Sequence, residues 1–399
     1  MKVLLVDDDR FALKLHTRLL ANCGFGNVVA HEHATDAVAL LELDNQAFGL
    51  ILCDLQMPRM DGVEFIRQLV RIRYAGALVL VSGEDSRILQ TAEKLSKAHR
   101  LNVLGILKKP VSSEQLQQVL KHNQLPVAKW PAASKIYARE ALSLAISGDE
   151  LVNYYQPKVD LVSGMVTGVE TLVRWRHPVD GLVYPDQFIG LAEKTGLIDD
   201  LTRVVLDGAL RQARTWQDAG LQLCVAVNVS MDNLISLDFP DFVAQAVRQA
   251  GVPPTSLILE VTESQLMNDP LMALDILTRL RLKRISLSID DFGTGHSSLA
   301  QLRDIPFDEL KVDRSFVHGV GRDPSLRTLF DASLGMGRQL GMKTVAEGVE
   351  DREDWNFLRL GGCDTAQGYF IARPMPGAEL PGWIDDWGVR YRNLVTSES

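Results

Sequence analysis

Eight polar side chains in residues 150–371 lie late in, or just beyond, short apolar runs typical of buried strands. A polar group inside a buried strand is costly unless it is paired, so several of them on different strands predict a shared active site. Five of the eight are carboxylates, and oxygen ligands without a His or Cys cluster favour Mg²⁺ or Mn²⁺ over zinc. The eight residues are Glu170, Asn228, Glu260, Asp290, Asp291, Lys311, Glu347 and Gln367.

The adjacent pair Asp290 and Asp291 suggests two metal ions rather than one. Two ions about 3.5–4 Å apart activate a water and stabilise an in-line displacement at phosphorus. Lys311 would orient that water or neutralise the developing charge. The segment DDFGTGHSSL at 290–299 continues into a glycine-containing loop, which alone would be a plain strand-to-helix turn but beside metal ligands predicts a mobile active-site loop. The pattern therefore predicts phosphodiester chemistry.

A second set of reactive groups follows apolar runs near the N-terminus. Ligands bind beyond the carboxyl ends of strands in doubly wound sheets, so these groups should converge. Clustered carboxylates repel one another and therefore favour binding of a hard cation such as Mg²⁺. Such a cation, together with a lysine, would allow an aspartate to accept a phosphoryl group. Taken alone, the acidic triplet would instead be a helix N-cap cluster. The groups are Asp7, Asp8, Asp9, Asp54, Ser82 and the Lys109-Pro110 dipeptide.

The order of strands and helices predicts an α/β protein with two domains. In residues 1–121 continuous apolar runs alternate with amphipathic stretches, which is typical of a parallel sheet covered on both faces. Residues 122–136 carry two prolines and no clean periodicity, so we expect a linker. Strand and helix patterns resume over 137–391, a length that suits a (β/α)8 barrel, and 392–399 would be a tail.

Composition and charge limit the classes of partner that this 399-residue chain is expected to bind. The net charge is −9, yet residues 1–121 hold 15 basic and 14 acidic residues, so the excess acid lies in the second part. That distribution argues against DNA or RNA as the main partner, because backbone binding needs a basic stripe. No apolar run approaches the ~18 residues of a membrane helix, and the four scattered cysteines indicate free thiols in a reducing cytoplasm.

The first domain resembles the receiver domain of bacterial response regulators over nearly all of residues 1–121. The resemblance rests on the acidic pair after the first strand, LCDLQMPRMDG, VLVSGE and LKKP. It implies a doubly wound five-stranded fold, with a sensor histidine kinase as phosphodonor and a cis Pro110. It also implies Asp54 as phosphoacceptor, Asp7 and Asp8 as partners of one Mg²⁺, Ser82 as a phosphoryl hydrogen-bond donor and Lys109 as the phosphoryl contact.

The second domain resembles the EAL family of cyclic di-GMP phosphodiesterases over about 250 residues. The motifs are YYQPKV, ETLVRW, VNVS, EVTES, DDFGTGHSSL, LKVDRSF, AEGVE and QGYFIARPM, with the namesake tripeptide at 170–172. The family fold is a modified (β/α)8 TIM-like barrel that includes an antiparallel strand. The activity that the resemblance implies is metal-dependent hydrolysis of cyclic di-GMP to linear pGpG.

By the same resemblance, each motif residue acquires an expected role. Glu170, Asn228, Glu260 and Asp290 would bind the first Mg²⁺ or Mn²⁺, and Asp290 would bridge to a second ion held by Asp291 and Glu347. Lys311 would act beside the nucleophilic water, near Gln367 and Glu350. Gln156 and Arg174 would contact substrate, which suits Arg174 because a guanidinium fork matches phosphate oxygens. Glu263 would anchor the loop after Asp291.

Three positions depart from the family patterns. Ile106 stands three residues before Lys109, where an aromatic residue often swings inward on phosphorylation, so transmission would run through another surface. Thr171 replaces the alanine of the EAL tripeptide, but neighbouring strand residues point to opposite faces, so we expect little effect. His296 stands where tyrosine is common, and we expect it to pack in the loop rather than bind metal.

Three other functions compete with an active phosphodiesterase regulated through Asp54. A degenerate EAL domain would bind cyclic di-GMP or a protein without turnover, but it would lack a metal ligand or Lys311, and none is missing. An enolase-like barrel also combines carboxylates, Mg²⁺ and a lysine, yet it would not need the adjacent aspartates. A DNA-binding regulator would need a basic recognition helix after residue 121. We also expect a homo-oligomer, with the direction of the phosphorylation effect left open.

Overall fold

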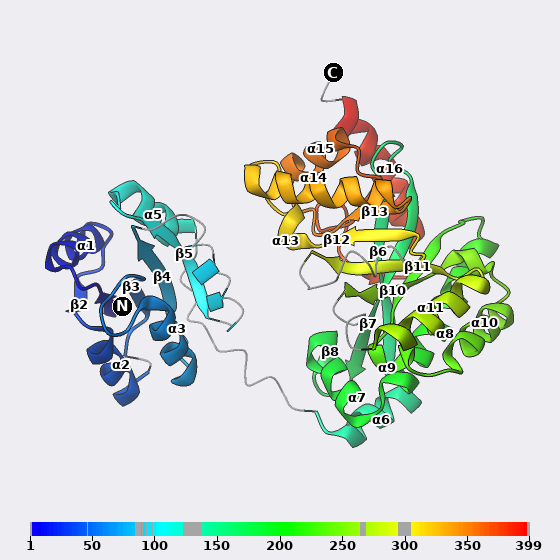
Figure 1. Cartoon of the computed structure of the whole chain (residues 1–399), viewed down its shortest axis with the longest axis horizontal. Helices are drawn as coiled ribbons and strands as arrows, with labels where there is room; N and C mark the ends of the chain where they lie inside the picture. The colour runs from blue at the N-terminus through cyan, green and yellow to red at the C-terminus, as the bar shows by residue number, and fades with distance from the viewer. Residues whose placement is uncertain are drawn as a thin grey trace. The chain divides into compact units, whose positions relative to one another are not determined.

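The computed structural model describes residues 2–45, 47–83, 89, 91–92, 95–96, 99, 101–122, 137–263, 269–293 and 305–396. The chain divides into two compact units, Met1–Lys135 and Ile136–Ser399 (Figure 1). Of the predicted linker at 122–136, His122 ends a helix and the rest lies outside the described residues. All four cysteines are free thiols, as the sequence predicted.

The first unit contains a five-stranded sheet whose order, β2-β1-β3-β4-β5, is that of a doubly wound fold. Every pairing between neighbouring strands is parallel, which confirms the predicted architecture. The elements are β1 (Lys2–Val6), α1 (Arg10–Asn22), β2 (Asn27–His31), α2 (Ala34–Leu43), β3 (Leu50–Asp54), α3 (Gly62–Arg71), β4 (Ala77–Ser82), β5 (Asn102–Lys108) and α5 (Ser113–His122).

Alternating residues of the central strands build two separate cores, one on each face of this sheet. Leu4 and Val6 of β1 belong to the core that contains side chains of α2 and α3. Val3 and Leu5 belong to the opposite core, formed with α1 and α5. This two-residue period is the strand geometry that a buried parallel sheet requires. The carboxyl ends of the strands are therefore held rigidly at one edge.

The second unit is a closed barrel of eight strands in the order β6-β14-β13-β12-β11-β10-β9-β7, with β7 pairing back to β6. Helices surround the strands (Figure 1). The elements are α6 (Arg139–Ser147), β6 (Leu151–Asp160), β7 (Val166–His177), β8 (Gly181–Val183), a 3₁₀ turn (Pro185–Gln187), α7 (Ile189–Thr195), α8 (Ile198–Asp218), β9 (Cys224–Asn228), α9 (Met231–Leu234), α10 (Phe239–Ala250), a 3₁₀ turn (Pro254–Ser256), β10 (Leu257–Thr262), α11 (Pro270–Leu282), β11 (Ser286–Phe292), β12 (Glu309–Val312), α13 (Arg314–Val317), α14 (Pro324–Gln339), β13 (Lys343–Ala346), α15 (Arg352–Gly361), β14 (Thr365–Ala366), β15 (Met375–Pro376) and α16 (Leu380–Thr396).

One strand of the barrel runs against the others. β6 is antiparallel to both of its barrel neighbours, β7 and β14, whereas the remaining barrel pairings are parallel. This arrangement confirms the modified (β/α)8 fold. Because of the reversed direction, the early residues of β6 lie at the mouth where the other strands end, and its last residue, Asp160, lies at the opposite mouth.

Four strands of the structure, β2, β6, β8 and β15, are not among the apolar runs of the sequence. β2 lies at the edge of its sheet, and its residues are only half-buried or exposed, so it needs no continuous apolar run. β6 carries polar residues that point into the barrel, and Pro157 interrupts its pattern. The predicted tail at 392–399 is a correction: α16 continues through Thr396, and its last turns carry exposed polar residues that resemble a tail in sequence.

Of residues 88–99, an amphipathic stretch for which the sequence pattern predicts a helix, only 89, 91–92, 95–96 and 99 are described. Within the described parts of the chain, no helix has both the length and the apolar character needed to cross a bilayer.

Helix α11 offers a matched test of barrel packing. Leu277 is fully buried in the barrel core, whereas Leu282 on the same helix is 79% exposed. We expect Leu277→Ala to lower the free energy of unfolding by about 3 kcal/mol, because a buried truncation loses transfer free energy and leaves a cavity. Leu282→Ala should change it by less than about 0.5 kcal/mol. Urea unfolding followed by tryptophan fluorescence measures both, and equal effects would contradict this packing.

Candidate active site and phosphoacceptor pocket

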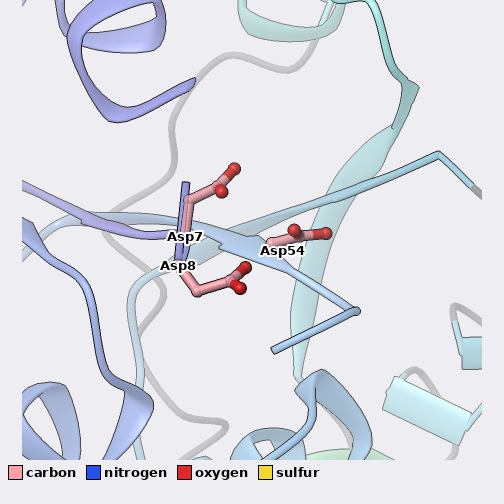
Figure 2. Close-up of side chains that lie close together, drawn as sticks. All are labelled: Asp7, Asp8 and Asp54. Carbon is pink, nitrogen blue, oxygen red and sulfur yellow. The ribbon is translucent and has the colours of Figure 1, made fainter. Parts of the chain in front are cut away.

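Three carboxylates meet at the carboxyl edge of the first sheet. Asp7 and Asp8 follow β1, and Asp54 ends β3, the neighbouring strand. One oxygen of each lies within 4.8 Å of the others, close enough to share one cation, and Figure 2 shows the three side chains together. Asp7 and Asp54 are buried while Asp8 is exposed. Asp9 does not join them, since its carboxylate caps α1 by accepting from the Phe11 N–H.

Lys109 supplies the positive charge beside these carboxylates. Its Nζ lies 2.6 Å from Asp54 Oδ2 and 2.9 Å from Asp7 Oδ2. The backbone N–H of Lys109 donates to the Ser82 carbonyl at the end of β4, which brings Ser82 to the same edge. Burial raises the pKa of Asp54 although Lys109 acts in the opposite direction. The Lys109-Pro110 peptide bond is cis, as predicted.

Two further residues, Ile106 and His16, bear on the function of this pocket. Ile106 is partly buried against the core shared with α2 and α3, where it packs as an ordinary apolar residue. His16 was not predicted to take part, because a lone histidine in a helical sequence carries no signal. The structure buries it with Nδ1 3.9 Å from Asp7 Oδ2, and burial lowers its pKa.

In the barrel, strand register gathers the predicted residues at one mouth. Gln156 of β6 lies opposite Glu170 of β7, and Glu260 of β10 lies opposite Asn228 of β9. Asp290 follows in β11, Lys311 in β12 and Glu347 directly after β13. A cleft of about 320 Å³ opens at this mouth, and its lining includes Gln156, Glu170, Asp290, Asp291, Glu347 and Glu350.

Lys311 stands at the centre of these carboxylates and has no exposed surface. Its Nζ lies 2.7 Å from Glu347 Oε1 and 3.0 Å from Glu260 Oε2. Asp290 Oδ2 is 3.1 Å away, and Glu170 Oε2 is 3.7 Å away. Burial favours the neutral amine, but the surrounding carboxylates outweigh it and raise the pKa of Lys311 above its ordinary value.

Two carboxylate triads surround this ammonium and have one member in common. Glu170, Glu260 and Asp290 each offer an oxygen within 4.8 Å of the others, and so do Asp290, Asp291 and Glu347. Asp291 adopts a left-handed backbone conformation (φ 55°) at a break in the β11–β12 register. Such a bulge re-aims side chains, so both adjacent aspartates contribute to the site. The donor set is all oxygen and fits Mg²⁺ or Mn²⁺.

Amide side chains orient Glu170 within the first triad. Asn228 Nδ2 donates to Glu170 Oε1 at 2.9 Å, and Gln367 Nε2 donates to Glu170 Oε2 at 2.5 Å. Gln367 Nε2 also donates to Gln156 Oε1, and Gln156 Nε2 donates to the Ala372 carbonyl. These bonds fix Gln156 and Gln367 beside the metal ligands. Thr171 lies on the opposite face of β7, where it lines another cavity with Leu201 and Val205.

The remaining predicted residues surround the cleft. Arg174 is buried, with its guanidinium 4.9 Å from the ring centre of Tyr184 and 5.7 Å from that of Tyr154. Glu350 pairs with Arg314 at 2.5 Å on the cleft wall. Glu263 Oε2 accepts from the Gly293 N–H at 2.8 Å, at the start of the loop. His296 and the rest of that loop, 294–304, lie outside the described residues.

The site also contains a buried ion pair that the sequence did not single out. Lys158 Nζ lies 2.8 Å from Glu260 Oε1 and 2.9 Å from Glu309 Oε1. Burial favours neutral Glu260, but Lys158 and Lys311 outweigh it and lower the pKa of Glu260 to about 2. The available signal was spacing, since Lys158 stands two residues after Gln156 and a strand places both on one face.

Comparison with known proteins identifies both units. The EAL domain family model matches residues 139–374, more than half of the chain, and the response regulator receiver domain model matches residues 3–121. The chain belongs to the EAL domain family. It combines that domain with a receiver domain, which makes it a response regulator with an EAL output domain.

Two curated relatives come from Pseudomonas aeruginosa. The cyclic di-GMP phosphodiesterase RocR is 32% identical over 385 residues, which cover 94% of this chain and 96% of RocR. The bifunctional diguanylate cyclase/cyclic di-GMP phosphodiesterase MucR is 44% identical over 370 residues, which cover 88% of this chain but 54% of MucR. A solved structure described as the PaMucR phosphodiesterase in complex with c-di-GMP has a TM-score of 0.58 and 43% identity, covering 60% of this chain and 98% of that one.

Protonation of Asp291 predicts how metal binding depends on pH. Burial and then Asp290 raise the pKa of Asp291 to about 6. Protons compete with a cation for such a carboxylate, so we expect Mn²⁺ affinity to fall about tenfold between pH 7 and pH 5. Calorimetric titration should use an Asp8→Asn background, which takes one of the three carboxylates out of the receiver cluster and so weakens metal binding there. In that background Asp291→Asn should bind Mn²⁺ more weakly and lose the transition near pH 6, whereas an unchanged transition would contradict this assignment.

Proposed function

We propose that this response regulator hydrolyses cyclic di-GMP to linear pGpG by two-metal-ion catalysis, under the control of phosphorylation at Asp54. The observation that carries the proposal is the pair of carboxylate triads that share Asp290 around Lys311. Support for the substrate comes from RocR, a relative of nearly the same length that is named for cyclic di-GMP hydrolysis. The acidic excess of the second domain is consistent with a small anionic substrate whose charge is offset by cations.

The proposed metal ligands form two sets that share Asp290. Glu170, Asn228, Glu260 and Asp290 would hold the first Mg²⁺ or Mn²⁺, and Asp290, Asp291 and Glu347 the second. When bound, the two ions would lower the pKa of a water and stabilise the charge that develops on the phosphoryl oxygens. Asn228 and Gln367 keep the Glu170 oxygens in place through their hydrogen bonds.

Lys311 acts beside the reacting water. The carboxylates around it keep it an ammonium, so it donates hydrogen bonds and neutralises charge at the point of attack. Gln367 and Glu350 both line the cleft and would lie near the attacking water. This proposal gives Lys311 an electrostatic role of the kind that often dominates catalysis.

Substrate contacts would come from side chains above the metal ligands. Arg174 holds its guanidinium near the rings of Tyr154 and Tyr184, with Nη1 donating to the Val173 carbonyl, and a guanidinium fork suits phosphate oxygens. Gln156 would contact the substrate from the antiparallel strand β6. Glu263 would hold the start of the loop after Asp291 through the Gly293 N–H.

Control would begin in the receiver pocket. Asp7 and Asp8 would hold one Mg²⁺ while a sensor histidine kinase supplies the phosphoryl group to Asp54, with Lys109 and Ser82 contacting it. The signal would pass through a surface other than an aromatic switch, because Ile106 occupies that position, and it would reach the loop after Asp291 through packing or a homo-oligomer. We place the protein in the cytoplasm, consistent with its four free thiols.

Turnover tests the catalytic assignment. Purified protein with Mg²⁺ or Mn²⁺ should convert cyclic di-GMP to pGpG, followed by liquid chromatography. Glu170→Ala and Lys311→Ala should each reduce the rate by more than about 10³-fold, because each removes charge that acts on the reacting phosphate. Lys343→Ala, an exposed lysine in the same domain, should leave the rate unchanged. Normal product formation by both site variants would refute the assignment.

Phosphorylation tests the regulatory assignment. Treatment with acetyl phosphate and Mg²⁺ should change the turnover of the wild-type protein, because a phosphoryl group on Asp54 must pull Lys109 and its neighbours into new contacts. The Asp54→Asn variant should keep the untreated rate with and without acetyl phosphate. Identical rates for the treated and untreated wild-type protein, with phosphorylation verified by mass spectrometry, would remove the regulatory part of the proposal.

A further inference from the structure

A chain of buried charges runs from the metal cleft along the barrel toward its opposite mouth. Beyond Lys311 and Glu260 it continues to Lys158, whose side chain is almost fully buried, and then to Glu309. Ser288 Oγ donates to the same Glu309 oxygen that Lys158 contacts, at 3.0 Å. Of these residues, only Lys311 and Glu260 take part in the proposed catalysis.

Strand direction explains why Lys158 and Glu309 lie away from the cleft. Gln156 and Lys158 share one face of β6, and because β6 is antiparallel, Lys158 lies deeper than Gln156 and closer to Asp160. A cavity of about 490 Å³ at the opposite mouth is lined by Lys158, Glu309 and Lys343, among others. Lys158 therefore approaches Glu260 from the side opposite to the substrate.

The two oxygens of Glu260 have different partners. Oε1 accepts from Lys158 at 2.8 Å, and Oε2 accepts from Lys311 at 3.0 Å. A carboxylate held at one oxygen by a buried cation cannot turn, so Oε2 stays on the side of Asp290 and Glu170. Without Lys158, the buried carboxylates of Glu260 and Glu309 would repel each other across the space it leaves.

We propose that Lys158 is a positioning residue for the metal site, which with Glu309 holds Glu260 so that Oε2 faces the cleft as a cation ligand. The inference rests on the proposed function, because it assumes that Glu260 is a ligand. Residues behind metal ligands typically change metal affinity when they are replaced. Lys158 would tune the site without touching the substrate.

Binding of Mn²⁺ in the absence of substrate tests this role. In the full chain with Asp8→Asn, we expect Lys158→Met to weaken Mn²⁺ binding at the barrel about tenfold or more, measured from the paramagnetic resonance signal of free Mn²⁺. Lys343→Met is the matched control, since Lys343 lines the same cavity but is exposed. It should bind Mn²⁺ like the Asp8→Asn parent, and Lys158→Met binding equal to the parent would overturn the inference.

A double variant separates positioning from a general effect on folding. Lys158→Met with Glu309→Gln removes the repulsion along with the lysine, so it should recover part of the lost affinity, which a merely structural role would not predict. No recovery would overturn the inference. If Lys158→Met does not fold, the double variant is compared with Glu309→Gln alone: weaker Mn²⁺ binding by the double variant supports the proposal, and equal binding would overturn it. A parent without any Mn²⁺ site in the barrel would contradict the proposed function as well.

Discussion

The structure of the barrel depends on one constraint: five acidic side chains must coexist at one mouth with only two buried ammonium groups beside them, Lys311 at their centre and Lys158 beneath. Lys311 contacts four of them and Lys158 contacts Glu260, yet two positive charges cannot balance Glu170, Glu260, Asp290, Asp291 and Glu347. Burial raises the pKa of Glu170 and of Glu347 in spite of Lys311. Buried charges persist when they are paired or coordinate metals, and so this mouth is suited to divalent cations.

The fold meets that constraint by taking each charge from a different element. Parallel strands bring Glu260, Asp290 and Lys311 to one end, while the reversed strand β6 brings Gln156 to the same end and Lys158 to the layer beneath. The register break at Asp291 allows two consecutive aspartates to serve one site. At the receiver pocket the solution is simpler, since two neighbouring strand ends and Lys109 suffice.

Much of this arrangement could be predicted from the sequence, because parallel strands end where their polar residues begin. Asp54, Glu260 and Asp290 follow apolar runs, so their convergence follows from strand direction alone. Lys158 and Glu309 could not be found in this way, because they lie within strands and their pairing depends on the barrel closing. The reversal of β6 was expected only from family resemblance, and its polar residues hid it from the search for apolar runs.

The C-terminal helix α16 is an element that the sequence pattern predicted poorly. Residues 392–396 continue α16 although their composition resembles a tail, because a helix that is packed earlier along its length extends into solvent at little cost. Similarly, β2 is recognisable only through its pairing with β1, since an edge strand does not need a continuous apolar sequence. Local pattern therefore predicted the buried elements well and the exposed ones poorly.

Anomalous diffraction from crystals grown with Mn²⁺ tests the central claim most directly. We expect two Mn²⁺ peaks at the barrel mouth, about 3.5–4 Å apart, with Asp290 bridging them, Glu260 on the first ion and Asp291 on the second. A mouth without any peak at saturating Mn²⁺, or a single ion that Asp290 does not contact, would contradict the account.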